Sequence, residues 1–109
     1  MVGGAALSRR AYLAGTDEER RADLQRMIDD PSVRAIFCAR GGYGSQRVVP
    51  NLDLAPLVRA PKPIIGFSDA TALLSAVVMA GVVSFHGPMV AVDVARGLTA
   101  EPGLVVVTA

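Results

Sequence analysis

The sequence predicts an α/β fold with a parallel sheet, because short apolar segments alternate with helical patterns along its 109 residues. The segments 33–39, 63–67 and 82–86 are each expected to form a strand. Strands that are joined through helices pair in parallel with right-handed crossovers, and function gathers at their carboxyl ends. The length suits one compact domain. We therefore expect a Rossmann-like parallel sheet with flanking helices.

The first helix is predicted to start after Thr16. Thr16 and Glu19 have the spacing of a capping box, and the acidic residues between them favour the positive end of a helix dipole. The pattern ends at Asp30-Pro31, because proline cannot continue a helix. Between these limits the apolar side chains recur on one helix face, at Leu24, Met27 and Ile28.

The remaining elements follow from the positions of proline and glycine. Strand 33–39 is expected to be buried on both faces, because its apolar residues do not alternate cleanly with polar ones. Residues 46–57 contain two prolines and predict short helices and turns. A helix over 69–80 would end at Gly81, before the third strand. Residues 103–109 are predicted either as a terminal strand or as a divergent tail.

Composition excludes several classes of protein. The net charge is +1 and the arginines are scattered among the acids, so no nucleic-acid partner is expected. One cysteine, Cys38, excludes an internal disulfide, and with one histidine it excludes the usual zinc sites. The longest uncharged run, 70–85, is shorter than the roughly 20 residues of a spanning helix, so no membrane partner is expected. The N-terminus lacks the pattern of a signal peptide, because its basic pair follows its apolar stretch.

The segment 61–71 carries the main candidate for chemistry. It places Ser68 between an apolar strand and a helix, with Gly66 two residues before it and Ala70 two residues after it. A nucleophilic serine on such a sharp turn needs small residues at these two positions. Amides that open the following helix could then hold an oxyanion. The alternative is that Ser68 only caps the helix.

A glycine loop, residues 41–44, follows the first predicted strand. It resembles half of a dinucleotide fingerprint, but Arg47 occupies the third glycine position and no P-loop Gly-Lys-Ser/Thr follows. Three interpretations remain open. The loop could cradle a phosphate, form a turn without chemistry, or direct backbone N–H groups at the serine turn as part of an oxyanion hole.

Four motifs together resemble the LD-carboxypeptidase family of serine peptidases, which includes muramoyltetrapeptide carboxypeptidases and microcin C self-immunity peptidases. The motifs cover most of residues 11–92, in the family's order and spacing. In this sequence they are Tyr12-Leu-Ala-Gly-Thr-Asp-Glu-Glu-Arg20, Ala35-Ile-Phe-Cys-Ala-Arg-Gly-Gly-Tyr-Gly-Ser45, Gly66-Phe-Ser-Asp-Ala-Thr71 and Ser84-Phe-His-Gly-Pro-Met89.

The resemblance implies a catalytic role for Ser68 as the nucleophile. It also implies an oxyanion hole made by the amide of Asp69 and an amide from Gly41 or Gly42. The implied reaction is hydrolysis of the amide between an L-configured diamino acid and a terminal D-alanine in murein tetrapeptides, during cytoplasmic recycling of the cell wall. The implied partner is this peptide substrate, with a homodimer as the parent assembly and no cofactor.

The resemblance covers only part of a family member. The family's triad glutamate and histidine lie in a C-terminal domain that follows the region seen here, and the family has a strand and helix before the point that matches Met1. We therefore expect residues 1–92 to be a partial N-terminal domain, and residues 93–109 to be a tail of unknown role. The chain by itself is expected to be inactive. The alternative function is a non-catalytic α/β module that binds a small ligand or nucleotide at the glycine loop.

His86, at the end of the third strand, is the one histidine that could replace the missing base, with Asp69 or Asp93 to orient it. In the family, however, the matching histidine is not the triad base. Arg40 and Tyr43 are candidates for substrate binding, because arginine pairs with a terminal carboxylate in bidentate fashion. Ordinary packing at the end of a strand is the alternative for both. Cys38 is expected to be a buried, inert thiol.

Overall fold

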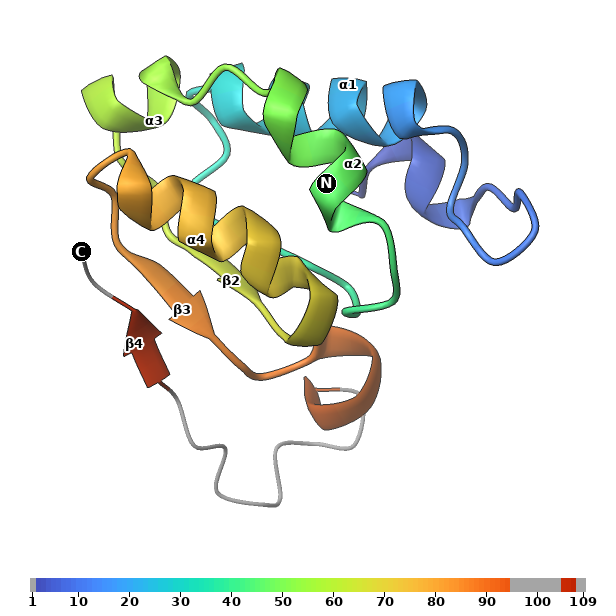
Figure 1. Ribbon diagram of the computed structural model, residues 1–109. Coiled ribbons are helices and arrows are strands. Elements are labelled where there is room, and N and C mark those ends of the chain that lie inside the picture. The colour runs from blue at the N-terminus through green and yellow to red at the C-terminus, as the bar shows by residue number, and fades with distance from the viewer. Residues whose placement is uncertain (1, 95–104, 108–109) are drawn as a thin grey trace.

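The computed structural model describes residues 2–94 and 105–107, which form a sheet with helices packed on it (Figure 1). The strands β1 (Ile36–Phe37), β2 (Ile64–Gly66) and β3 (Ser84–His86) run parallel in this order. The predicted parallel sheet is therefore confirmed. A fourth strand, β4 (Val105–Val107), pairs antiparallel with β3, in agreement with the prediction of a terminal strand. The division of the chain at residue 92 stays a prediction.

The described helices alternate with the parallel strands as predicted. They are α1 (Asp17–Asp29), α2 (Ser45–Val48), α3 (Ala55–Arg59) and α4 (Thr71–Met79), with 3₁₀ turns at Gly4–Leu7, Val49–Asn51 and Ser68–Ala70 and a π-helical segment at Val90–Val94. In Figure 1, α4 lies along β2 and β3, while α1, α2 and α3 lie together above it.

The start of α1 has the predicted capping box. Thr16 Oγ1 accepts the Glu19 amide at 3.1 Å, and Glu19 Oε2 accepts the Thr16 amide at 2.7 Å. The sequence did not predict the buried lysine at the end of α1. This residue, Lys62, is only 7% exposed. Its Nζ donates to the carbonyl oxygens of Met27 and Asp30. A cation at this position satisfies the last carbonyls and favours the negative end of the helix dipole.

One hydrophobic core joins α1, α3 and α4 to one face of the sheet. Its fully buried members include Ile28, Leu57, Ile64, Leu74 and Val77. The single polar side chain among the largest fully buried ones is that of Ser84, whose hydroxyl donates to the Leu74 carbonyl. These contacts hold α4 against β3, and the turn that precedes α4 is positioned with it.

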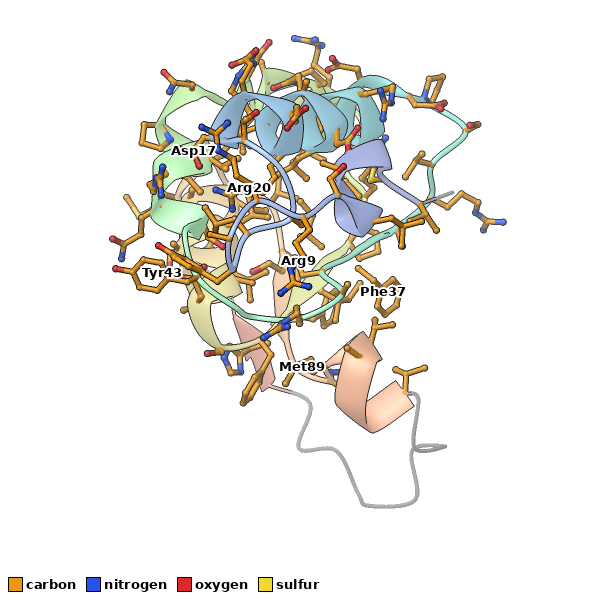
Figure 2. All side chains as sticks on the ribbon, turned by 90° about the vertical axis from the view of Figure 1, so that its right-hand side faces the viewer. Arg9, Asp17, Arg20, Phe37, Tyr43 and Met89 are labelled. Atoms are coloured by element: carbon orange, nitrogen blue, oxygen red, sulfur yellow. The ribbon has the colours of Figure 1, made fainter. Side chains whose placement is uncertain are left out.

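The other face of the sheet carries Phe37, which is 55% exposed. In the described residues this strand is therefore buried on one face, and burial of 33–39 on both faces stays a prediction for a full-length protein. In the described structure only two of these residues are paired as a strand, and the alternation of side chains points Ile36 into the core and Phe37 away from it. Since α1, α3 and α4 all pack on the Ile36 side, Phe37 is left uncovered by them (Figure 2).

Candidate active site at the carboxyl ends of the strands

Ser68 stands on a strained turn between β2 and α4. Its φ is +56°, a left-handed conformation that side chains other than glycine rarely adopt, at a cost of about 1–3 kcal/mol. The 3₁₀ turn Ser68–Ala70 begins at this residue, and its first hydrogen bond runs from the Ala70 amide to the Phe67 carbonyl. The amides of Ser68 and Asp69 precede that bond and are the first donors of the turn. The side chain of Ser68 is exposed.

The position two residues before the serine cannot hold a side chain, in agreement with the prediction of a small residue there. A Cβ on Gly66 would lie 2.8 Å from the Ala70 Cβ and 3.2 Å from the Cys38 sulfur. Real Cβ atoms do not approach other carbon atoms so closely, so the turn closes only with glycine at position 66. The amide of Gly87 donates to the Gly66 carbonyl at 2.7 Å, which holds the end of β2 against the chain after β3.

The glycine loop packs directly against the serine turn. A Cβ on Gly41 would lie 2.6 Å from the Ser68 Cβ and 3.1 Å from its hydroxyl oxygen. A Cβ on Gly42 would meet only Arg40 Nε, at 3.8 Å, but Gly42 adopts a φ of +70°, and Gly44 has a φ of +97°. Of the three interpretations of this loop, the contact with Ser68 favours the one in which its backbone faces the serine. Two successive strands, β1 and β2, bring these segments together.

A hydrogen bond that the sequence did not predict links the two segments. The Ser45 amide, at the start of α2, donates to Asp69 Oδ2 at 2.8 Å. On its other side α2 is joined to α1, because Arg47 forms an ion pair with Asp17 at 2.7 Å. Arg20, through its hydrogen bond, and then Arg47 hold the pKa of the Asp17 carboxyl below its usual value. No local sequence pattern signals the Ser45–Asp69 bond or the Arg47–Asp17 ion pair, because each joins residues far apart in the chain.

Arg40 directly precedes the glycine loop and Tyr43 lies on it, and neither side chain is in the core. Arg40 is exposed, and Tyr43 is 68% exposed with its ring edge-on to Tyr12 at 6.1 Å. Figure 2 shows Tyr43 at the outer edge of the molecule, on the opposite side of the view from Phe37. Both side chains are therefore free to reach a ligand, and their role in substrate binding stays a prediction.

His86 is near the site but is not joined to the serine by a hydrogen bond within the described residues. Its ring packs against that of Phe67, with 5.0 Å between the ring centres. Asp69 Oδ2 accepts the Ser45 amide, and the side chain of Asp93 lies outside the described residues. The described structure therefore contains a candidate nucleophile and candidate oxyanion donors, without an assembled serine–histidine pair.

Cys38 is a partly buried thiol beside the serine turn. Burial raises its pKa to about 11, so the thiol stays protonated near neutral pH. The described residues contain no cluster of His, Cys, Asp or Glu that could hold a metal ion. They also contain no helix long and apolar enough to cross a membrane.

A serine with positive φ on a strand-to-helix turn, with donor amides beside it, is typical of enzymes that attack a carbonyl carbon through a serine. Residues 1–87 match the family described as "LD-carboxypeptidase N-terminal domain", and the chain belongs to this family.

The sequence relatives and structural neighbours agree with this membership. The chain is 46% identical over 96 residues to the murein tetrapeptide carboxypeptidase of Pseudomonas aeruginosa, covering 87% of this chain and 30% of that protein. The crystal structure of muramoyltetrapeptide carboxypeptidase from Oxalobacter formigenes aligns with a TM-score of 0.77 at 36% identity, covering 87% of this chain and 33% of that one. The microcin C7 self-immunity protein MccF, in its apo state, aligns with a TM-score of 0.75 at 32% identity, over 81% of this chain and 27% of that one.

The chain spans about 30% of the length of the curated carboxypeptidase that it matches. These matches favour the carboxypeptidase interpretation over a non-catalytic module that binds nucleotide at the glycine loop.

Proposed function

We propose that this chain is the nucleophile-bearing part of a serine LD-carboxypeptidase, a hydrolase of murein peptides. The observation that carries the proposal is Ser68, whose φ of +56° exposes its hydroxyl beside both the first amides of its turn and the backbone of Gly41. A strained, exposed serine with donors next to it is what acyl transfer requires.

In the proposed reaction the Ser68 oxygen attacks the carbonyl carbon of the L-configured diamino acid, and its proton passes to a base. The carbonyl oxygen becomes negatively charged and accepts hydrogen bonds from the Asp69 amide and from an amide of Gly41 or Gly42. Collapse of this intermediate breaks the C–N bond and releases D-alanine, which takes the proton. Water then hydrolyses the acyl-enzyme and regenerates the Ser68 hydroxyl.

The base and its acidic partner are assigned to the rest of a full-length protein. The His86 ring packs against Phe67 and makes no hydrogen bond to Ser68 within the described residues, which supports this assignment. Arg40 and Tyr43 are exposed at the loop and are proposed to contact the substrate, Arg40 through the terminal carboxylate. We further propose that the full-length protein acts in the cytoplasm in peptidoglycan recycling, and that it is a homodimer.

The test is Ser68→Ala in a protein of full family length that carries these residues. D-alanine release from an L-lysyl- or diaminopimelyl-D-alanine tetrapeptide should fall by several orders of magnitude, because only binding and the oxyanion donors remain. A fluorophosphonate probe should label the unmodified protein at Ser68. Ser75→Ala is the matched control, because Ser75 is an exposed serine within α4.

Loss of less than about tenfold in Ser68→Ala, which corresponds to roughly 1.4 kcal/mol, would exclude Ser68 as the nucleophile. Stabilisation of the protein by nucleotide, without labelling by the probe, would instead support the binding module.

A further inference from the structure

We propose that the Asp69 carboxylate is a positioning group that holds the glycine loop over Ser68. This role is separate from that of the Asp69 backbone amide. The inference rests on the proposed function, because it states how one oxyanion donor is kept in place. The contact that carries it is the hydrogen bond from the Ser45 amide to Asp69 Oδ2, 2.8 Å long and partly buried.

The loop needs such a tether because its backbone is intrinsically free. Gly41, Gly42 and Gly44 supply three of its four residues, and glycine loses more conformational freedom on ordering than any other residue. The loop nevertheless approaches Ser68 so closely that a Cβ on Gly41 would be 2.6 Å from the Ser68 Cβ. A donor that stabilises an oxyanion has to be held to within about 0.5 Å of its productive position.

The two ends of the loop are held by different bonds. Before the loop, the Cys38 amide donates to the Ile65 carbonyl at 2.8 Å and continues the pairing of β1 with β2. After the loop, Ser45 is bonded to Asp69, the residue next to the nucleophile. Displacement of Ser68 and displacement of the loop are therefore coupled through one side chain.

The second contact of α2 is a weaker candidate for this task. Arg47 pairs with Asp17 at 2.7 Å, but the Arg47 side chain is 52% exposed. Ion pairs this exposed contribute little, whereas the hydrogen bond from the Ser45 amide to Asp69 is partly buried and holds a backbone atom directly after the loop. Within the described residues Asp69 makes no ion pair, and its carboxylate accepts the hydrogen bond of the Ser45 amide.

The tether requires an oxygen acceptor and does not require a charge, and this distinction makes it testable. Asp69→Asn keeps an acceptor oxygen in nearly the same place, whereas Asp69→Ala removes it. If Asp69 instead acted by its charge, for example by orienting a histidine, asparagine would be as damaging as alanine. Asp53→Ala is the matched control, because Asp53 Oδ1 likewise accepts a backbone amide, that of Ala55, in an exposed turn.

The experiment compares these variants in a protein of full family length, by hydrogen exchange at the Ser45 amide and by kcat and KM for tetrapeptide cleavage. We expect Asp69→Ala to speed exchange at Ser45 and to lower kcat about 10- to 100-fold, with KM changed much less, since a misplaced donor acts on the transition state. Asp69→Asn should restore slow exchange and most of kcat. Asp53→Ala should leave both unchanged.

Unchanged exchange at Ser45 in Asp69→Ala would overturn the tether, and so would an Asp69→Asn variant as slow in catalysis as Asp69→Ala. Faster exchange with unaltered kcat in an active protein would overturn the positioning role. If the unmodified protein released no D-alanine, the proposed function would fail. The exchange rates at Ser45 would still decide whether Asp69 holds the loop.

Discussion

Gly66 and Ala70 face each other across the serine turn with no room for a further carbon atom, since a Cβ on residue 66 would lie 2.8 Å from that of Ala70. The turn therefore depends on the absence of a side chain at position 66. Gly66 also lies against Cys38, so the constraint comes from two sides.

Gly66→Ala should lower the stability of the chain's fold by about 1–3 kcal/mol, because overpacking forces neighbouring atoms to shift. The Ala70 Cβ, which obstructs it most closely, is bonded to the backbone and cannot rotate away. Denaturant unfolding measures the change. A variant as stable as the unmodified protein would show that the turn can open without cost.

Gly41→Ala should impair catalysis through steric contact alone. The φ of Gly41 is not in the left-handed region, but its added methyl group would collide with the Ser68 Cβ and the Phe67 carbonyl. We expect kcat to fall by at least about tenfold in a full-length protein, because the loop or the serine must move. An unchanged kcat for this variant would contradict the close contact between Gly41 and Ser68.

Gly42→Val should lower kcat more than it weakens substrate binding. Space is available at this position, but the φ of +70° is unfavourable for valine, so the loop has to change its backbone. Loss of one oxyanion donor costs about 2.7–4 kcal/mol. Gly81→Val is the matched control, because Gly81 has a φ of +86° and open space, and it follows the opposite end of α4 from the serine turn. A change in KM alone would make the loop a binding element.

Cys38 should resist alkylation in the folded protein. Its pKa of about 11 against an ordinary value of 9.0 lowers the thiolate fraction near pH 8 by roughly 100-fold. The raised pKa of Cys38 also affects folding. The thiol of the unfolded chain loses its proton at a lower pH than that of the folded chain, so the free energy of unfolding should fall as pH rises from 9 towards 11. Mass spectrometry after iodoacetamide treatment, with and without denaturant, measures the reactivity. Rapid labelling of the native protein would contradict the burial.

The 109 residues expressed alone should release no D-alanine and should self-associate. A serine hydroxyl needs a base, and His86 makes no hydrogen bond to Ser68 within the described structure. Phe37 and Val83 are 55% and 46% exposed, which favours association. Size-exclusion chromatography should show oligomers, and Phe37→Asp should shift them towards monomer. A monomer that cleaves tetrapeptide, and loses this activity in His86→Ala, would refute this prediction.

Local rules in the sequence determined much of the fold. The capping box at Thr16 and Glu19 was predictable because its hydrogen bonds span only three residues. The order of strands and helices followed from apolar segments bounded by proline and glycine. The strained serine turn was indicated by the small residues at 66 and 70, again a short-range constraint.

The tertiary structure decided what depends on residues far apart in the chain. Ser45 meets Asp69, and Lys62 meets the end of α1, only because the sheet brings these segments together. In the sequence Lys62 looks like an ordinary solvated lysine. Phe37 looks like a core residue, yet it is exposed because the helices pack on the other face of β1. Periodicity shows which residues share a face, whereas the packing of other elements determines whether that face is covered.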